Sequence, residues 1–334
     1  MREQNLHSRM CFTYPHSISS HTSRPGKSLN REILSISAMG VGGRDLWRRP
    51  RHLRAFLVRA LELGVDHLDL AATYGNGMSE TRVGQSAIGI RDYLKIATKI
   101  TRPDLDSLHC RRHTPGSYIS SSIEGSLRRL QTDHVDICYI HHWDPVTPLD
   151  VQLRRMEMIL KSGKARLIGA CNMNLHQLIS WQEIADDPLR ISVIQQHINL
   201  LHQEASPSLR EYCNRQHIPI IGYSPFARGW LADPSQHLRE RRAELLEYAQ
   251  RFLPQDFLLH LEILQRQARQ ASVPMANLAL SKLFEGRLLD AAIPSAGTIK
   301  HLVENAESVL NSSDSMPSRS IASSFHSSLQ HPTY

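Results

Sequence analysis

Residues 67–80 read HLDLAATYGNGMSE, a stretch that places the carboxylate of Asp69 at the end of an apolar run typical of a buried strand. A buried charge is costly unless it is paired. Either this run is not a core strand, or Asp69 has a partner elsewhere in the chain. Five residues further on, the same stretch offers Tyr74, whose hydroxyl can take part in proton transfer.

Apolar runs of strand length recur along the chain and alternate with segments of helical periodicity. The strand-like runs between residues 33 and 295 are ILSISAMG, DHLDLA, LKIATKI, VDICYIH, ARLIGA, SVIQQ, IPIIGYS and DAAIPS. Helical spacing of apolar residues is found at 53–61, which precedes Gly64, and at 119–130, 149–161, 175–185 and 298–309. Alternating strands and helices indicate a parallel sheet.

A count of about eight such units without a break predicts an α/β fold of the closed (β/α)8 type, a TIM barrel. The alternative is an open, doubly wound sheet. Its nucleotide-binding turn, G-x-G-x-x-G, is missing, because MGVGGRD at 39–45 has a different glycine spacing. The length of 334 residues would allow two domains, but barrels of roughly 250 residues or more are commonly one domain.

We predict one barrel domain over 31–310, flanked by disordered tails at 1–30 and 311–334. Both tails are rich in Ser, His, Arg and Pro and lack a sustained apolar period. The Arg and Ser content of the first tail leaves an organelle transit peptide open, although no amphipathic helix pattern supports one.

The composition argues against several classes of protein. Lys and Arg outnumber Asp and Glu by 39 to 32, but the surplus lies in short clusters such as WRRPRHLR and CRRH rather than in a long basic stripe, so we expect no nucleic-acid partner. No apolar run approaches the roughly 18 residues of a membrane span, and we expect no membrane partner.

The five cysteines form no C-x-x-C pair, which argues against a disulfide framework or a structural zinc site and favours a reducing compartment. The sequence 109–113, HCRRH, has no matching second ligand pair and is interpreted as a polar loop. We therefore predict a cytoplasmic protein and no metal site.

Polar residues end most of the predicted strands. In a barrel the chemistry is built at the carboxyl ends of the strands. These strand-end residues are Asp69, Lys99, His141, Cys171 with Asn172, Gln195, Tyr223 and Pro294.

Lys99 lies one predicted strand away from Asp69 and is a candidate for its partner. A phenol has a pKa near 10, and an ammonium within about 4 to 6 Å lowers that value by stabilising the phenolate. Lys99 could act on Tyr74 in this way, while His141 could donate a hydrogen bond to a bound carbonyl oxygen. Together these residues predict a proton-delivery site.

The chain from about Ile33 to about Leu310 resembles the aldo-keto reductase family. HLDLAATYGNGMSE is similar to the family's Asp-x-Ala-x-x-Tyr-Gly-x-Gly-x-Ser-Glu segment, IATKI to its lysine strand, and SLRRLQTDHVDICYIHHWDP to its histidine strand. GKARLIGACNM resembles the Gly-Lys-Val-Arg-x-Ile-Gly-Val-Ser-Asn motif, and QQHINLL, IGYSPFARGWL and IPSAGTIKHLVEN resemble the later cofactor segments.

The resemblance implies reduction of an aldehyde or ketone to an alcohol, with a hydride from NADPH and a proton from Tyr74. It implies that Lys99 and Asp69 tune the tyrosine and that His141 orients the carbonyl. The adjacent His142 is a weaker candidate, because strand alternation would turn it away from the barrel mouth.

The resemblance also assigns a cofactor site for NADPH, with NADH possible. Asn172 and Gln195 would bind the carboxamide and Tyr223 would stack on the nicotinamide ring. The matching segments add Ser224, Pro225, Lys300, His301, Glu304 and Asn305. Ser295 and His301 stand where many relatives have Lys and Arg, which weakens the expected hold on the 2′-phosphate.

Two further departures from the family pattern concern the strand ends. Leu70 replaces a Thr after Asp69, and Cys171 replaces a Ser before Asn172, so that one hydrogen bond is expected to be weak.

Three aromatic residues, Trp143, Phe226 and Trp230, are candidates for an apolar pocket that receives a small carbonyl substrate. The sequence leaves the substrate and the oligomeric state open. Two rival classes are a non-catalytic nucleotide-sensing subunit resembling potassium-channel β subunits and a short-chain dehydrogenase. The second would need a Tyr-x-x-x-Lys pair, which the sequence lacks.

Overall fold

The computed structural model describes residues 33–37, 50–102, 116–235 and 243–310. The predicted tails at 1–30 and 311–334, the MGVGGRD segment and the HCRRH segment lie outside these residues.

Eight parallel strands in the described part of the chain form a closed ring, as the (β/α)8 prediction required. They are β1 (Ile33–Ser37), β2 (His67–Asp69), β3 (Lys95–Ile100), β4 (Val135–Ile140), β5 (Ala165–Cys171), β6 (Val193–Asn199), β8 (Ile220–Tyr223) and β9 (Ala291–Ile293). The neighbour order is β5-β4-β3-β2-β1-β9-β8-β6, and a β5–β6 pairing closes the ring. A short strand, β7 (His202–Gln203), pairs antiparallel with the end of β6.

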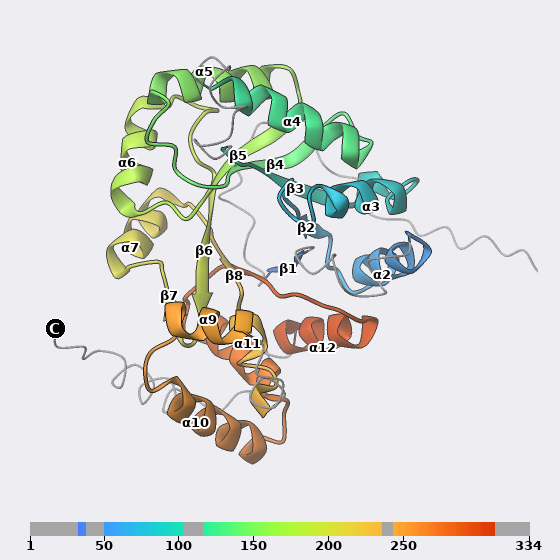
Figure 1. The fold of residues 1–334 in the computed structure, drawn as a ribbon, viewed down its shortest axis with the longest axis vertical. Helices are drawn as coiled ribbons and strands as arrows, with labels where there is room; N and C mark the ends of the chain where they lie inside the picture. The colour runs from blue at the N-terminus through green and yellow to red at the C-terminus, as the bar shows by residue number, and fades with distance from the viewer. Residues whose placement is uncertain (1–32, 38–49, 103–115, 236–242, 311–334) are drawn as a thin grey trace, which may run out of the picture.

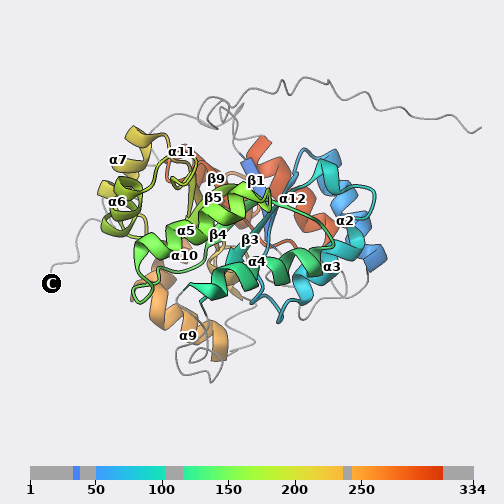
Figure 2. The same cartoon turned by 90° about the horizontal axis from the view of Figure 1, so that it is seen from above.

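Helices lie around the outside of this ring (Figures 1 and 2). They are α2 (Pro50–Glu62), α3 (Met78–Ser86), α4 (Ser117–Leu130), α5 (Leu149–Lys161), α6 (Leu175–Ile184), α7 (Pro207–Gln216), α9 (Ala243–Phe252), α10 (Phe257–Gln270), α11 (Met275–Glu285) and α12 (Ile299–Leu310), with 3-10 turns η3 (Arg91–Tyr93) and η5 (Ala227–Gly229). The helices predicted from periodicity are confirmed, with small differences at their ends.

The helix α2 shows how the sequence produces this arrangement. Its residues Leu53, Phe56, Leu57 and Ala60 recur at helical spacing, and each is fully buried. The helix ends before Gly64, which has a φ of +77°, a left-handed conformation that glycine adopts without steric cost. The apolar stripe therefore packs this helix against the sheet, and the glycine allows the chain to leave the helix.

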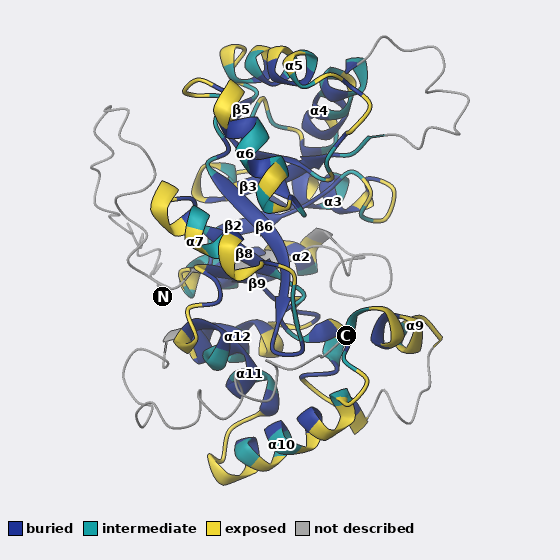
Figure 3. Ribbon diagram, turned by 90° about the vertical axis from the view of Figure 1, so that its left-hand side faces the viewer, coloured by how far each residue is buried: buried dark blue, intermediate teal, exposed yellow. Residues whose placement is uncertain are grey.

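A second, smaller core cluster fills the inside of the ring. Its buried members are Ala97, Tyr139, Cys171, Val193, Ile221, Ala291 and Ile293. Tyr139 lies opposite Lys99 in the β3–β4 register, and alternate residues of a strand share one face. This cluster therefore lies on the same inner face as Lys99. Figure 3 shows the buried strands inside and the exposed sides of the helices outside.

Close packing inside the ring depends on one glycine in particular. A Cβ at Gly169 of β5 would lie 2.4 Å from Cε1 of Tyr139, so no larger residue fits beside that ring. None of the helices in the described ranges has the length and apolarity required to cross a bilayer.

Candidate active site

Asp69 and Lys99 form a buried ion pair at the carboxyl end of the ring. Lys99 Nζ lies 2.7 Å from Asp69 Oδ1 and 2.6 Å from Oδ2, and both residues are 1% exposed. The parallel register sets Asp69 opposite Ala97, so that Lys99 follows on the same face of β3. The pairing predicted for Asp69 is confirmed, and it answers why a buried strand ends in a carboxylate.

The hydroxyl of Tyr74 completes this group. Tyr74 lies in the loop between β2 and α3, and its Oη is 3.0 Å from Lys99 Nζ. The same ammonium donates to the carbonyl oxygen of Leu70 at 2.9 Å. An ammonium has three N–H donors, and Asp69, Leu70 and Tyr74 engage them all. Because Lys99 donates to the phenol oxygen, the phenolic proton is left to be donated to another group.

The pKa of Tyr74 differs from the predicted direction. Burial of the phenol raises the pKa of Tyr74 to about 12, although the charge of Lys99 acts to lower it. The predicted lowering effect of Lys99 is present, but the loss of water around the phenol, which the prediction did not count, outweighs it. Burial alone would lower the pKa of Lys99, but the Asp69 carboxylate holds it well above its usual range. At neutral pH the pair is therefore a protonated phenol beside an ammonium.

His141 lies directly after β4 and faces the same region. Its ring makes an edge contact with the ring of Tyr74, with 6.5 Å between centroids. Burial, aided by the charge of Lys99, lowers the pKa of His141 to about 3, so the imidazole is neutral. Its Nδ1 lies 2.8 Å from Thr101 Oγ1. With the threonine hydroxyl as donor, the ring proton sits on Nε2, where it can be donated to a carbonyl oxygen.

His142 is not turned away as strand alternation predicted. The rings of His141 and His142 are stacked, with centroids 4.6 Å apart and planes 15° apart. Strand β4 ends at Ile140, so the alternation does not extend to these residues. His142 is the more exposed of the two, and its Nδ1 lies 3.4 Å from Asn172 Nδ2.

The three residues expected at the nicotinamide, Asn172, Gln195 and Tyr223, lie next to this group. Gln195 Nε2 donates to Asp69 Oδ1 at 2.8 Å, and the Tyr223 hydroxyl donates to Asn172 Oδ1 at 3.0 Å. Asn172 Nδ2 donates to the carbonyl oxygen of His141 at 3.2 Å. Asn172 has a φ of +57°, a conformation that asparagine tolerates better than most residues.

The thiol of Cys171 makes the weak contact expected of it. Its Sγ lies 3.7 Å from Gln195 Oε1, and burial raises the pKa of the thiol well above its usual range. The Gln195 carbonyl oxygen therefore keeps most of its acceptor capacity.

The remaining cofactor candidates lie after β8 and on α12. Ser224 has a φ of +53° and Pro225 is buried. Lys300 has an 80% exposed side chain, and its Nζ lies 3.7 Å from Glu304 Oε1. His301 is exposed and Asn305 is buried. These α12 residues occupy the first turns of a helix that follows β9, where backbone N–H groups favour an anion.

Two of the three aromatic pocket candidates are half-buried, and the third is not accessible. Trp143 and Phe226 pack against the main core and remain partly exposed. Trp230 is fully buried, and its indole N–H donates to the carbonyl oxygen of Leu245 at 3.4 Å. The structure places Trp230 in the core, where its ring meets Phe257 edge-on.

Thr101 is a site residue that the sequence analysis did not identify. Thr101 continues the alternation of Ala97 and Lys99 along the chain. The sequence alone therefore could have predicted that its side chain points into the barrel. Its partner His141 belongs to a different strand end, and that contact requires the barrel register.

Comparison with known sequences identifies the family. The profile described as the aldo/keto reductase family matches residues 37–321. The aldo-keto reductase YhdN of Bacillus subtilis is 34% identical over 174 residues, which are 52% of this chain and 51% of that protein. The chain therefore aligns with about half the length of this relative. The L-glyceraldehyde 3-phosphate reductase of Escherichia coli K12 is 26% identical over 303 residues, covering 83% of this chain and 85% of the relative.

Solved structures share the fold. An aldo/keto reductase from Klebsiella pneumoniae in complex with NADP and acetate superposes with a TM-score of 0.69 at 22% identity, covering 91% of this chain and 93% of that one. The thermostable aldo-keto reductase Tm1743, in complex with the inhibitor epalrestat, gives a TM-score of 0.66 at 24% identity, covering 88% and 94%. The profile match over most of the sequence, together with this common barrel, shows that the chain belongs to the aldo-keto reductase family of oxidoreductases.

Proposed function

We propose that this protein reduces an aldehyde or ketone to the alcohol with NADPH as hydride donor and Tyr74 as proton donor. The observation that carries the proposal is the 3.0 Å contact between Lys99 Nζ and Tyr74 Oη, held by the buried pair with Asp69. A fixed ammonium beside a phenol favours departure of the proton, because it stabilises the phenolate that remains.

His141 supplies the second contact to the substrate. As a neutral imidazole it can donate Nε2–H to the carbonyl oxygen on which negative charge develops during reduction. Tyr74 then gives its proton to that oxygen, and Lys99 stabilises the phenolate. Thr101 keeps His141 in the tautomer that donates, through its 2.8 Å contact with Nδ1.

The residues at the mouth fit a nicotinamide cofactor. Among the described residues the Cys171 thiol is a weak donor to Gln195 Oε1, and a carboxamide N–H₂ would be a stronger one. Tyr223 stacks one ring face on His197, with planes 8° apart, and its other face is the one proposed to meet the nicotinamide. When bound, the cofactor supplies the hydride. The rest of the chemistry is proton transfer by Tyr74.

The first turns of α12 are proposed to hold the phosphate end, with Lys300 and His301 toward the 2′-phosphate and Asn305 toward the adenosine. Lys300 is exposed and pairs only loosely with Glu304, so it can turn to an anion at small cost. This arrangement supports a preference for NADPH that is weaker than a tight clamp of Lys and Arg would give.

A direct assay tests the proposal. The purified 334-residue chain is mixed with NADPH or NADH and a panel of aliphatic, aromatic and phosphorylated aldehydes and ketones, and the loss of the reduced-nicotinamide absorbance is followed. We expect turnover with at least one carbonyl, faster with NADPH than with NADH at equal concentrations. Tight NADPH binding without turnover on the whole panel would contradict the proposal and favour a non-catalytic, nucleotide-sensing subunit.

A further inference from the structure

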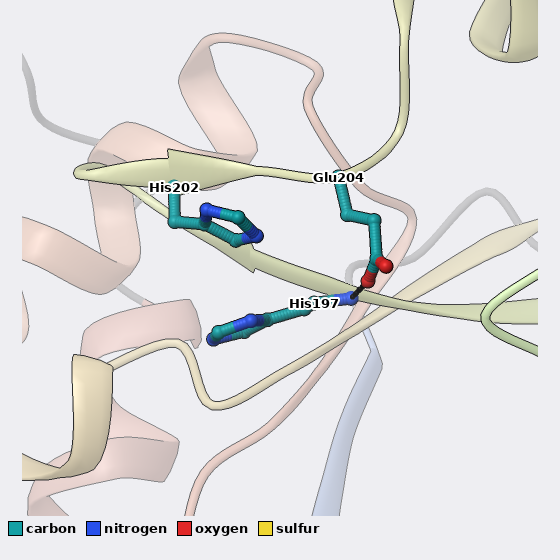
Figure 4. Close-up of side chains that lie close together, drawn as sticks. All are labelled: His197, His202 and Glu204. Atoms are coloured by element: carbon teal, nitrogen blue, oxygen red, sulfur yellow. Dashed lines mark hydrogen bonds between the residues drawn. The ribbon is translucent and has the colours of Figure 1, made fainter. Parts of the chain in front are cut away.

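Three potential metal ligands gather on the hairpin formed by β6 and β7, on the far side of the Tyr223 ring face proposed to meet the nicotinamide. They are His197 on β6, His202 on β7 and Glu204 directly after β7, and one ligand atom from each lies within 4.8 Å of the others. Figure 4 shows the two imidazole rings close together and tilted to one another, with Glu204 beside them. Their spacing of 197, 202 and 204 matches no familiar metal motif, so the sequence alone did not identify them.

The antiparallel hairpin explains why these side chains meet. Asn199 lies opposite His202 in the β6–β7 register, and Glu204 bonds to the backbone of His197 through its own N–H and through its carboxylate. The Glu204 N–H donates to the His197 carbonyl at 3.0 Å, and the His197 N–H donates to the Glu204 carboxylate at 3.3 Å. The ring centroids of His197 and His202 are 4.4 Å apart.

Both histidines have hydrogen-bond partners of the kind that metal-bound imidazoles usually have. Such imidazoles usually donate their second ring N–H to a neighbouring acceptor, which fixes the ring and its tautomer. His197 Nε2 lies 2.9 Å from the hydroxyl of Tyr248, and the ring of His202 hydrogen-bonds to the backbone of Phe252. Both partners belong to α9.

We propose that His197, His202 and Glu204 bind one borderline divalent transition-metal ion, Zn²⁺ being the best match. Two imidazoles and one carboxylate are a known ligand set for zinc, with water completing the tetrahedron. Nδ1 of His197 is the ligand atom in this arrangement, because Nε2 faces the Tyr248 hydroxyl at 2.9 Å and the Asn199 amide nitrogen at 3.4 Å.

The geometry requires a modest closure of the site. Metal–ligand bonds of about 2.0–2.2 Å in a tetrahedron hold the ligand atoms roughly 3.4 Å apart. The three atoms here must therefore approach by up to roughly 1.4 Å. Glu204 is exposed and can supply most of this movement by side-chain rotation. The positive charge of Arg228 acts on His197 and opposes a cation there, whereas the charge of the Glu204 carboxylate acts on His202 and favours one.

A metal bound here would join the hairpin to α9 through Tyr248 and Phe252. It would also fix the ring of His197, whose centroid lies 5.1 Å from that of Tyr223. The role that follows is a structural clamp behind Tyr223. This inference does not depend on the proposed reductase activity, and its test measures metal binding rather than turnover.

The test uses the full chain after treatment with a chelator. The protein is titrated with Co²⁺, whose visible d–d absorption reports coordination, and Zn²⁺ is then added to displace it. We expect one Co²⁺ per chain, displaced by Zn²⁺, and a higher melting temperature with Zn²⁺. Glu204→Gln and His202→Gln should each weaken Co²⁺ binding at least about ten-fold, and Tyr248→Phe should weaken it by about ten-fold through the lost outer contact.

The control is His176→Gln, which removes an exposed imidazole from α6 and should leave Co²⁺ binding unchanged. Circular dichroism of the metal-free variants checks their fold, and Glu204→Gln alters only an exposed side chain. If no d–d absorption develops, or if Glu204→Gln and His202→Gln bind Co²⁺ as the unaltered chain does, the site does not exist. In the second case the signal arises from other histidines of the chain.

Discussion

The ammonium of Lys99 lies 2.6 Å from the carboxylate of Asp69, and neither side chain is more than 2% exposed. Such a pair costs desolvation energy, which its mutual attraction and additional hydrogen bonds must offset. Gln195 and the carbonyl oxygen of Leu70 provide those bonds. A buried ion pair is weak support for stability as such, so its position beside Tyr74 points to the tyrosine as the reason for it.

We expect Lys99→Met to lower both stability and activity. The substitution leaves the Asp69 carboxylate buried without its cation, which typically costs about 3–5 kcal/mol of unfolding free energy. The control is Lys95→Met on the same strand, because Lys95 pairs with Asp66 at 2.8 Å with a 64% exposed side chain. That change should cost less than about 1 kcal/mol. Urea unfolding of the two variants measures the difference, and equal losses would contradict a special role for the Asp69 pair.

The contact between Thr101 and His141 predicts a positioning effect. Thr101→Val removes the hydroxyl that holds Nδ1 and keeps the shape of the side chain. We expect carbonyl reduction to fall about ten-fold or more, mainly in kcat, because misplacing the His141 donor loses part of the roughly 10²–10³-fold that one such donor contributes. Thr101→Ser should restore most of the rate. His141→Ala should be more severe than His142→Ala, and the reverse order would move the carbonyl contact to His142.

Acid should destabilise the fold through His141. In the folded chain burial lowers its pKa to about 3, whereas an unfolded histidine titrates near 6.5. The unfolded state therefore binds more protons between these values, and stability is lost as pH falls from about 6.5 towards 3. One titrating group changes the free energy of unfolding by at most about 1.4 kcal/mol per pH unit. His141→Gln should flatten the dependence of the urea midpoint on pH in this window, and exposed His176→Gln should not.

Much of the barrel was predictable, because apolar periodicity is a local property of the sequence. The stripe of Leu53, Phe56 and Leu57 marked α2, and the runs before Asp69 and Lys99 marked β2 and β3. Once the sheet was taken as parallel, the meeting of Asp69 with Lys99 followed from the strand order.

The errors concern quantities that only the three-dimensional packing sets. His142 stacks on His141 because β4 ends at Ile140, and strand ends are the least predictable feature of a sequence. The net pKa of Tyr74 depends on burial by residues far away in the chain. Trp230 could not be assigned to pocket or core before its surroundings were known.

Cofactor preference should depend on the first turns of α12. Lys300→Ala and His301→Ala are each expected to lower NADPH affinity and to leave NADH affinity nearly unchanged, because only NADPH carries the 2′-phosphate. A charge-assisted contact is worth about ten-fold or more in affinity. Glu304→Gln removes the carboxylate that lies 3.7 Å from Lys300 and should raise the NADPH to NADH ratio. Fluorescence titrations measure each ratio, and ratios unchanged in all three variants would place the phosphate elsewhere.

The strictest prediction concerns Tyr74, because Tyr74→Phe removes one oxygen and little shape. The Lys99 ammonium keeps its bonds to Asp69 and Leu70, so the fold should remain intact. General acid catalysis is typically worth about 10² to 10⁴-fold, or roughly 3 to 5.5 kcal/mol. Carbonyl reduction should therefore fall by at least about two decades, while NADPH affinity measured by fluorescence changes only a few-fold. Combining Tyr74→Phe with Lys99→Met should reduce the rate little further, since residues that act as a unit are not additive. Near-normal turnover by Tyr74→Phe would exclude this phenol as the acid, whatever the distances around it.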